Sequence, residues 1–464
     1  MAVKKTENEI SQQITENNIQ FIQSEVIDLH GVTKTLVTSS KYFLRQLRNN
    51  GGWLHITSAI MGISMDSEPL DGTGIAMEID NQNVDFKPDL QSFCILPWLE
   101  ETSAPTASIM CDLELKGRDL EYWRVCCRQQ CKAQIQNLTA TGYSLFSAFE
   151  YEFYLVEKGT FKPIFDVTNI YSDVFVDEIR PFVYETMKTL DDMGITTEMF
   201  TPEFAPGQLE LTLSPDFGVK SVDNAMRYKK VVKAMAKKHG MEALFLSKPY
   251  PDESGSSNHF NHSLWHTTEK TNAFSDPDKP YKLSAICMNW IGGLQEHSKA
   301  LASLFWANMN CFERCKPGTF APTNNSWGFD NRTICYRVKN DSPSVTYVEN
   351  RIPGAGSNPY LVTAGCLIAG MDGIKRNLKP KSEPFVGNLY EVDVLPEGIE
   401  SLPKSFEESL KCLQEDEVLS KELGDVFIKA FSALRNDEIK KCNENFENDE
   451  QRFEYYRKLY GKFL

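Results

Sequence analysis

The sequence lacks the long apolar runs that membrane-spanning helices need. No stretch of its 464 residues approaches the roughly 18 consecutive apolar residues required to cross a bilayer. Its first residues, 1–20, are polar and lack the apolar core and small-residue cleavage site of a signal peptide. We therefore expect a cytoplasmic protein with no membrane partner.

Positive charge is in short supply. Lysine and arginine together number 49 against 64 aspartates and glutamates, so the net charge at pH 7 is −15. A surface of this sign repels phosphate backbones and anionic lipid. We expect no nucleic-acid partner.

Paired cysteine motifs are also missing. The 12 cysteines are spread over the chain, and the tightest groups are Cys126, Cys127 and Cys131, and Cys311 with Cys315. Neither group has a Cys-x-x-Cys pair or a nearby histidine that would complete a zinc site. Without an export signal they are expected to be reduced, mostly structural thiols.

What remains is the composition of an ordinary globular protein, with 41% hydrophobic and 24% charged residues. Residues 1–110 carry short β-rich runs such as 21–27 and 93–97 around turn clusters such as 71–74, which predicts a small sheet-based domain. Residues 111–464 alternate strands such as 145–156 with helical patterns, and this predicts an α+β domain. The helical patterns cover residues 119–141, 179–193, 219–239, 281–310, 359–378 and the tail 403–464.

The strongest chemical signal is a set of glutamates in apolar strands. Glu150 and Glu152 are two residues apart, so both carboxylates leave the same face of a strand. Glu203 precedes a Pro-Gly turn, and Glu210 follows it in a run of alternating leucines. Carboxylates in apolar surroundings need a compensating cation, because an isolated buried charge is very costly.

Two further groups complete an oxygen-rich set. His259 enters a strand after a loop of small residues, and Glu349 precedes a second Pro-Gly turn. Singly, each element is more often a charged strand edge or a structural histidine. Together they indicate hard divalent cations, magnesium or manganese, rather than zinc.

Four arginines accompany these acids: Arg314, Arg332, Arg337 and Arg351. A guanidinium binds phosphate or carboxylate with two parallel hydrogen bonds, so arginines beside a metal-binding carboxylate cluster suit phosphoryl transfer from a nucleotide to a carboxylate. The alternative is that they only form ion pairs with the glutamates.

In chain order these residues form motifs that cover nearly the whole sequence: Glu150-x-Glu152; Glu203 with Ala205-Pro206-Gly207-Gln208 and Glu210; Gly255-Ser256 with His259 and Ser263-Leu264-Trp265; Asp330-Asn331-Arg332; and Glu349-x-Arg351 with Asn358-Pro359-Tyr360-Leu361. This series resembles the glutamine synthetase superfamily. The resemblance implies a small N-terminal β-grasp domain and a large catalytic domain in which helices surround an antiparallel-sheet funnel. It also implies a homo-oligomer of stacked rings, expected to be a dodecamer, with active sites between neighbouring subunits.

The resemblance also implies a role for each site residue. Glu152, Glu203 and Glu210 would hold one metal ion, and Glu150, His259 and Glu349 another, among two to three magnesium or manganese ions in all. Gly255, Arg314 and Arg351 would bind glutamate, Arg332 the transferring phosphoryl group, and Ser263 and Arg337 the ATP substrate, so that Arg332 and Arg351 are the expected catalytic residues. The implied reaction forms a γ-glutamyl phosphate and then an amide with an amine.

Several positions depart from the family pattern. Enzymes that make glutamine carry a proton-accepting glutamate where this chain has Phe320, and Tyr347 and Asn261 replace an arginine and a histidine of the nucleotide side. One interpretation is a ligase whose acceptor is an amine other than ammonia, because Phe320 could pack against an alkyl group. A second is a catalytically inactive structural or chaperone-like oligomer, since the chain is also similar to the lengsins, a branch regarded as non-enzymatic. A third, ammonia as acceptor, would need another base.

Overall fold

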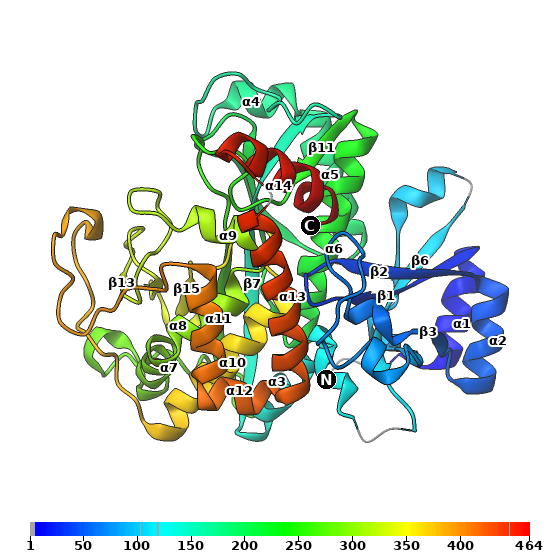
Figure 1. The fold of residues 1–464 in the computed structure, drawn as a ribbon, viewed down its shortest axis with the longest axis horizontal. Helices are drawn as coiled ribbons and strands as arrows, with labels where there is room; N and C mark the ends of the chain where they lie inside the picture. Colours follow the sequence, from blue (N-terminus) through cyan, green and yellow to red (C-terminus); the bar gives the residue numbers. More distant parts are fainter. Residues whose placement is uncertain (1–4, 103, 118–119, 445) are drawn as a thin grey trace.

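The computed structural model describes residues 5–102, 104–117, 120–444 and 446–464, which build two β-sheets and the helices that pack on them (Figure 1). Both sheets consist mainly of antiparallel strands, and helices and strands interleave along the chain. The predicted α+β class is confirmed. None of the helices within the described ranges is long and apolar enough to cross a membrane.

The first sheet lies in the N-terminal part of the chain, drawn in blue and cyan in Figure 1. Its strand order is β2-β1-β6-β4-β3, with β5 paired to β6, and only β1 and β6 run parallel. The predicted boundary between residues 110 and 111 lies inside β6, and the division into two domains stays a prediction. The elements are α1 (Glu7–Glu16), β1 (Phe21–Ile27), β2 (Thr33–Ser39), α2 (Ser40–Asn50), β3 (Leu54–Thr57), β4 (Asn83–Pro88), β5 (Cys94–Ile95) and β6 (Thr106–Glu114).

The second sheet has nine strands and carries the predicted site. Its order is β13-β14-β15-β12-β7-β9-β8, and the short strands β10 and β11 also pair with β7. All pairs are antiparallel except β13 with β14. The strands are β7 (Tyr143–Glu157), β8 (Thr197–Pro202), β9 (Gln208–Leu213), β10 (Asp216–Phe217), β11 (Met241–Leu244), β12 (Asn258–His266), β13 (Trp327–Phe329), β14 (Tyr336–Lys339) and β15 (Tyr347–Asn350).

The side chains of β7 alternate between the two faces of the sheet, and this alternation determines which face carries the polar site residues. Phe149, Tyr151 and Phe153 are fully or almost fully buried, and the Tyr151 ring stacks on Tyr228 of α6 with centroids 5.1 Å apart. The glutamates between these aromatic residues must therefore point away from α6. Packing of the aromatic residues against α6 thus orients the glutamates toward the opposite face of the sheet.

Helices surround the large sheet. They are α3 (Cys127–Ala140), α4 (Asp173–Glu178), α5 (Arg180–Asp192), α6 (Val219–Lys238), α7 (Ala285–Glu296), α8 (Ser298–Phe305), α9 (Met309–Arg314), α10 (Pro359–Arg376), α11 (Phe406–Glu415), α12 (Glu417–Leu423), α13 (Asp425–Glu444) and α14 (Asp449–Phe463). Short 3₁₀ helices lie at Ser58–Met61, Met77–Ile79, Leu90–Ser92, Pro97–Thr102, Tyr122–Val125, Pro280–Lys282, Pro343–Val345 and Leu389–Glu391. The helices predicted at 179–193, 219–239 and 359–378 and the helical tail are confirmed.

Two helix predictions need correction. The pattern at 281–310 is divided among α7, α8 and α9, because Ser284 caps the start of α7 and Asn308 caps α9. His297 separates α7 from α8 and is hydrogen-bonded through both ring nitrogens to Asp372 and Asp416. The helix predicted at 119–141 begins only at Cys127; position 119 lies outside the described residues, and 122–125 form a 3₁₀ turn.

A buried ion-pair network ties the two sheets together. Arg128 of α3, 2% exposed, binds both carboxylate oxygens of Asp223 of α6 at 2.9 Å. It also binds Asp112 of β6 at 3.1 Å and Asp89, which follows β4, at 2.9 Å. The hydroxyl of Tyr360 in α10 donates to Asp223 at 2.6 Å. The Arg128 guanidinium therefore joins the N-terminal sheet to α3 and α6.

Replacing Arg128 by methionine is expected to lower the free energy of unfolding by about 3–5 kcal/mol, since it leaves buried carboxylates without their counter-charge. Urea unfolding followed by tryptophan fluorescence measures this change. Arg180→Met is the matched control, because Arg180 is exposed and pairs with Asp177 on the surface at 3.1 Å; its cost should stay below about 1 kcal/mol. Equal losses in the two variants would contradict the role given to Arg128.

Candidate active site

The pairing register of the large sheet brings distant residues to one face. Glu150 of β7 lies opposite His259 of β12, and Glu152 lies opposite Glu210 of β9. Because directly opposed residues in a sheet share a face, these side chains project together. On the next strand Glu349 lies opposite Asn261 in β12. Residues up to 200 positions apart thus meet through register alone.

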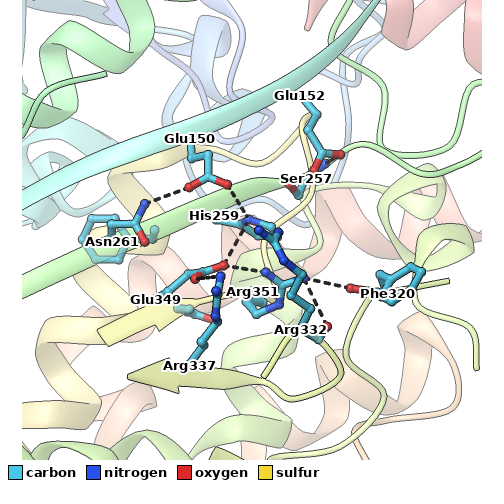
Figure 2. Close-up of polar contacts among 12 residues, drawn as sticks. Glu150, Glu152, Ser257, His259, Asn261, Phe320, Arg332, Arg337, Glu349 and Arg351 are labelled. Atoms are coloured by element: carbon cyan, nitrogen blue, oxygen red, sulfur yellow. Dashed lines mark hydrogen bonds and ion pairs between the residues drawn. The ribbon is translucent and has the colours of Figure 1, made fainter. Parts of the chain in front are cut away.

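Three of these side chains form a potential metal-binding group. Nδ1 of His259 lies 3.3 Å from Oε1 of Glu150 and 3.4 Å from Oε1 of Glu349, and Figure 2 shows the three side chains pointing toward one another. Each residue offers one ligand atom, and these atoms lie within 4.8 Å of one another. Nε2 of His259 is buried without a hydrogen-bond partner in the described chain. Two carboxylates and an imidazole fit a magnesium or manganese ion.

Glu152 is fixed beside this group by residues that the sequence analysis did not single out. The backbone N–H and the hydroxyl of Ser257 donate to its two carboxylate oxygens at 2.9 and 2.8 Å. Nε2 of Gln208 donates to the same carboxylate at 3.2 Å. Gln208 belongs to one of the motifs and Ser257 lies between Ser256 and His259 of another, yet only the fold reveals that they bind Glu152. Together they orient the Glu152 carboxylate toward the acidic face.

The remaining two carboxylates show how much negative charge this face concentrates. Burial, together with the charges of Glu152 and Glu150, raises the pKa of Glu203 to about 7. Burial and the charges of Glu150, Glu152 and Glu203 raise the pKa of Glu210 to about 10. Carboxyl groups whose ionised form is this unfavourable call for added positive charge, which divalent cations supply.

Glu150 and Glu349 behave in the opposite way because they already have partners. Burial alone would raise the pKa of Glu150, but the hydrogen bond and charge of His259, with a hydrogen bond from Asn261, lower it to about 2. Burial opposes ionisation of Glu349 too, and the charges of Arg351 and His259 lower its pKa. Nδ2 of Asn261 donates to Glu150 at 3.2 Å. Asn261 therefore supports Glu150, one of the predicted metal ligands, in this fold.

Two arginines converge on Glu349. Nη1 of Arg337 in β14 lies 3.0 Å from Oε2 of Glu349, and Arg351 binds the other oxygen. The second amino group of Arg351 donates to the backbone carbonyls of Phe320 at 3.2 Å and Arg332 at 3.3 Å (Figure 2). Arg351 therefore holds the two segments that carry Phe320 and Arg332, on either side of β13, against the sheet.

Arg314 and Gly255 lie next to each other behind this face. Arg314, 3% exposed, donates to the carbonyls of Arg351, Ile352 and Pro353 at 3.1–3.5 Å. A Cβ at Gly255 would come within 2.7 Å of the Arg314 side chain, so glycine is required there. The predicted glutamate-binding role of both residues stays a prediction.

A cavity of about 410 Å³ opens beside the acidic cluster. Its lining includes the predicted nucleotide-side residues Ser263, Arg332 and Arg337, and also Tyr347. Lys339, which no sequence motif indicated, follows Arg337 on the same face of β14 and adds a third cation to the lining. The apolar end of the lining is formed by Phe146, Tyr171, Met199, Leu213, Pro215 and Val345. Such a mixture of apolar surface and a few charged groups is typical of ligand sites.

Phe320 occupies the edge of the cluster. Its side chain is 59% exposed and meets the Tyr390 ring edge to face at 6.1 Å between centroids. Its backbone has φ of 55°, in the left-handed region that non-glycine residues seldom adopt. The hydroxyl of Tyr390 reaches the carbonyl of Ala321 at 3.4 Å. An apolar, aromatic surface therefore borders the acidic cluster. It lies at the position where enzymes that make glutamine carry a proton-accepting glutamate.

Comparison with known proteins agrees with this geometry. The model of the family described as glutamine synthetase, catalytic domain, matches residues 124–455. A glutamate–isopropylamine ligase of a Pseudomonas species is 31% identical over 447 residues, covering 94% of this chain and 95% of the relative. Human lengsin is 27% identical over 461 residues, covering 96% of this chain and 85% of lengsin.

The fold itself also has solved counterparts. A structure of GmaS without ligand matches with a TM-score of 0.81 at 24% sequence identity and covers 96% of this chain and 98% of that one. Because the likeness extends over nearly the whole chain, the fold implied by the sequence resemblance is confirmed.

Replacing His259 by asparagine is expected to weaken manganese binding at least tenfold, because it removes one of three converging ligands. Isothermal titration calorimetry with MnCl₂ measures the affinity. His266→Asn is the matched control, since His266 ends the same strand outside the cluster; it should bind manganese like the unaltered protein. Equal affinities of the two variants would remove His259 from the metal site.

Proposed function

This chain belongs to the glutamine synthetase catalytic-domain family, and on that premise we propose that it is an ATP- and divalent-metal-dependent ligase that joins glutamate to an amine other than ammonia. The observation that carries the proposal is the single face on which the predicted metal ligands gather beside a cavity with Arg332, Arg337 and Lys339. Carboxylates for metal ions and cations for phosphate are what phosphoryl transfer needs.

The proposed reaction has two steps, transfer of a phosphoryl group from ATP to glutamate and attack of the amine on the product. A carboxylate resists attack by an amine, so the γ-carboxylate of glutamate first attacks the terminal phosphorus of ATP, and ADP leaves. The amine nitrogen then attacks the γ-carbonyl carbon, phosphate leaves, and the nitrogen loses a proton. Two to three magnesium or manganese ions, held by Glu150, His259 and Glu349 and by Glu152, Glu203 and Glu210, would neutralise phosphate charge.

The arginines have distinct parts in this proposal. Arg332 is exposed and lines the cavity, and its guanidinium would approach the transferring phosphoryl group there. Arg337 would contact the nucleotide from β14, with Ser263 on the neighbouring part of the lining. Arg351 ties Glu349 to the Phe320 loop, so it couples the metal side of the site to the acceptor side. Arg314 and Gly255 would complete the glutamate pocket.

Phe320 is the reason for proposing an acceptor other than ammonia. Ammonium and alkylammonium ions must both lose a proton before they attack, and a phenyl ring takes none, so Phe320 discriminates between them through packing and not through proton transfer. A primary alkylamine gains instead from packing its alkyl group on the Phe320 and Tyr390 rings. The likeness to a glutamate–isopropylamine ligase supports the same class of acceptor.

The alternative of an inactive structural oligomer has little to support it. Lengsins are among the relatives. The chain nevertheless has all six metal ligands predicted from sequence, and strand register places five of them on one face: Glu150, Glu152, Glu210, His259 and Glu349. Residues without a catalytic use would not need this costly concentration of carboxylates. Assembly into stacked rings of twelve subunits and a cytoplasmic location stay proposals that rest on the family.

Phosphate release from ATP should rise above background when glutamate, magnesium and a suitable alkylamine are all present. A panel of ammonium, methylamine, isopropylamine, ethanolamine and a polyamine identifies the acceptor. Glu152→Ala should lower the rate by at least about a hundredfold, because it removes a metal ligand from the reacting face. Rates equal to those of Glu152→Ala with every amine would sink the proposed ligase activity.

Replacing Phe320 by glutamate is expected to shift the ratio of ammonium to alkylamine turnover at least tenfold toward ammonium, since it removes the apolar surface on which the alkyl group packs and places a carboxylate beside the small ammonium ion. Rates of γ-glutamyl amide formation with each amine give the ratio. Phe320→Leu is the control: it keeps an apolar side chain and shares the left-handed backbone, so it should not gain ammonium turnover. An unchanged ratio in Phe320→Glu would show that position 320 does not select the amine.

A further inference from the structure

A second cavity, of about 560 Å³, lies between the C-terminal helix and the outer edge of the large sheet. Its walls come from the loop after β7, the C-terminal half of α6, β11 and the end of α14, and Figure 1 shows α14 beside β11 and α6. It shares no lining residue with the cavity of the active site. Nothing in the proposed ligase reaction uses it.

This cavity is basic in a chain that is strongly acidic. Five lysines line it, against one acidic residue, Glu242; the lysines are Lys158, Lys233, Lys237, Lys458 and Lys462. The chain as a whole carries a net charge of −15. Five like charges around one hollow repel each other, and this arrangement costs free energy unless an anion joins them.

Counter-charges within the described chain do not neutralise these lysines. Among its ion pairs, the only one that involves a lining lysine joins Lys458 to Glu454, one helical turn away, at 2.6 Å. Nζ of Lys233 donates to the backbone carbonyl of Lys462 at 3.4 Å. The C-terminal ends of α6 and α14 contribute a partial negative charge of about half a unit each, well short of the charge on five ammonium groups.

The environment of α6 agrees with this imbalance. Burial lowers the pKa of Lys233 to about 8. One turn earlier, burial and the charge of Lys233 lower the pKa of Lys229 to about 7, and its Nζ lies 5.3 Å from the centre of the Phe245 ring. Both ammonium groups would be stabilised by a nearby anion.

The rest of the lining is apolar. Phe161, Met241, Ala243 and Leu244 contribute to the wall. At Gly461 a Cβ would approach the Leu244 side chain to 3.1 Å, so the close contact of α14 with β11 that shapes the cavity uses a glycine. A hollow of this volume holds a molecule the size of a nucleotide. Its occupant therefore combines negative charge with an apolar body.

We propose that this lysine cavity binds a small organic anion that carries two or more phosphate groups. Ammonium groups are compact charges with three donors each, and a phosphate offers several acceptor oxygens and up to two negative charges. Two phosphates match the four lysines that lack a carboxylate partner, and the apolar wall accommodates the organic part. The net charge of −15 on the chain disfavours a nucleic acid.

Titration calorimetry with pyrophosphate and with ADP tests this site. EDTA is included so that the acidic active site, without divalent ions, repels phosphate. The double variant Lys233→Gln/Lys237→Gln should weaken binding of both probes at least tenfold, through the loss of two charge-assisted hydrogen bonds. ADP should bind more tightly than pyrophosphate because of its apolar body. Lys233→Arg, which keeps the charge, should stay within about threefold of the unaltered protein.

A matched double variant, Lys41→Gln/Lys375→Gln, removes the same charge from exposed lysines elsewhere and should bind both probes normally. If Lys233→Gln impairs folding, Lys237→Gln/Lys462→Gln replaces it, since both of these side chains are exposed. Equal weakening in the cavity and control variants overturns the site, as does an absence of saturable binding. A loss of subunit assembly in the cavity variant without any anion binding also overturns it and assigns the lysines to a contact between copies.

Discussion

The concentration of carboxylates on one face of the large sheet is the constraint on which the rest of the site depends. Glu203 and Glu210 are held where burial and neighbouring charges raise their pKa, and Glu349 remains ionised because Arg351 and His259 balance it. Full ionisation of such a face is stabilised by added cations. The arginines satisfy part of that demand from within the chain, and divalent metal ions would satisfy the remainder.

The scaffold places this charge by ordinary packing. The aromatic residues of β7 pack in the core against α6. Because successive side chains of a strand point to opposite faces, Glu150 and Glu152 lie on the other face. Antiparallel register then fixes His259 and Glu210 beside them, because a slip of one residue would turn every side chain to the wrong face. The buried network around Arg128 keeps the N-terminal sheet attached to the helices behind this arrangement.

The active-site cavity and the lysine cavity have opposite electrostatics. The active-site cavity gathers glutamates and needs cations before it can accept a nucleotide, whereas the lysine cavity can accept phosphate directly. They are built from different strands and helices, although both involve β7 or the loop that follows it. Glu150 and Lys158 therefore stand on one continuous segment, which gives the two sites a common structural element.

The sequence alone determined the α+β class, most of the helices, the family and the residues of the acidic cluster, because strand alternation and local motifs are written in neighbouring positions. It could not divide 281–310 into three helices, since His297 is held there by Asp372 and Asp416, far along the chain. Only the tertiary structure decided that Ser257 and Gln208 hold Glu152, that Asn261 supports Glu150, and that lysines from three distant segments line one cavity. Such contacts depend on strand register and helix packing, which no local pattern specifies.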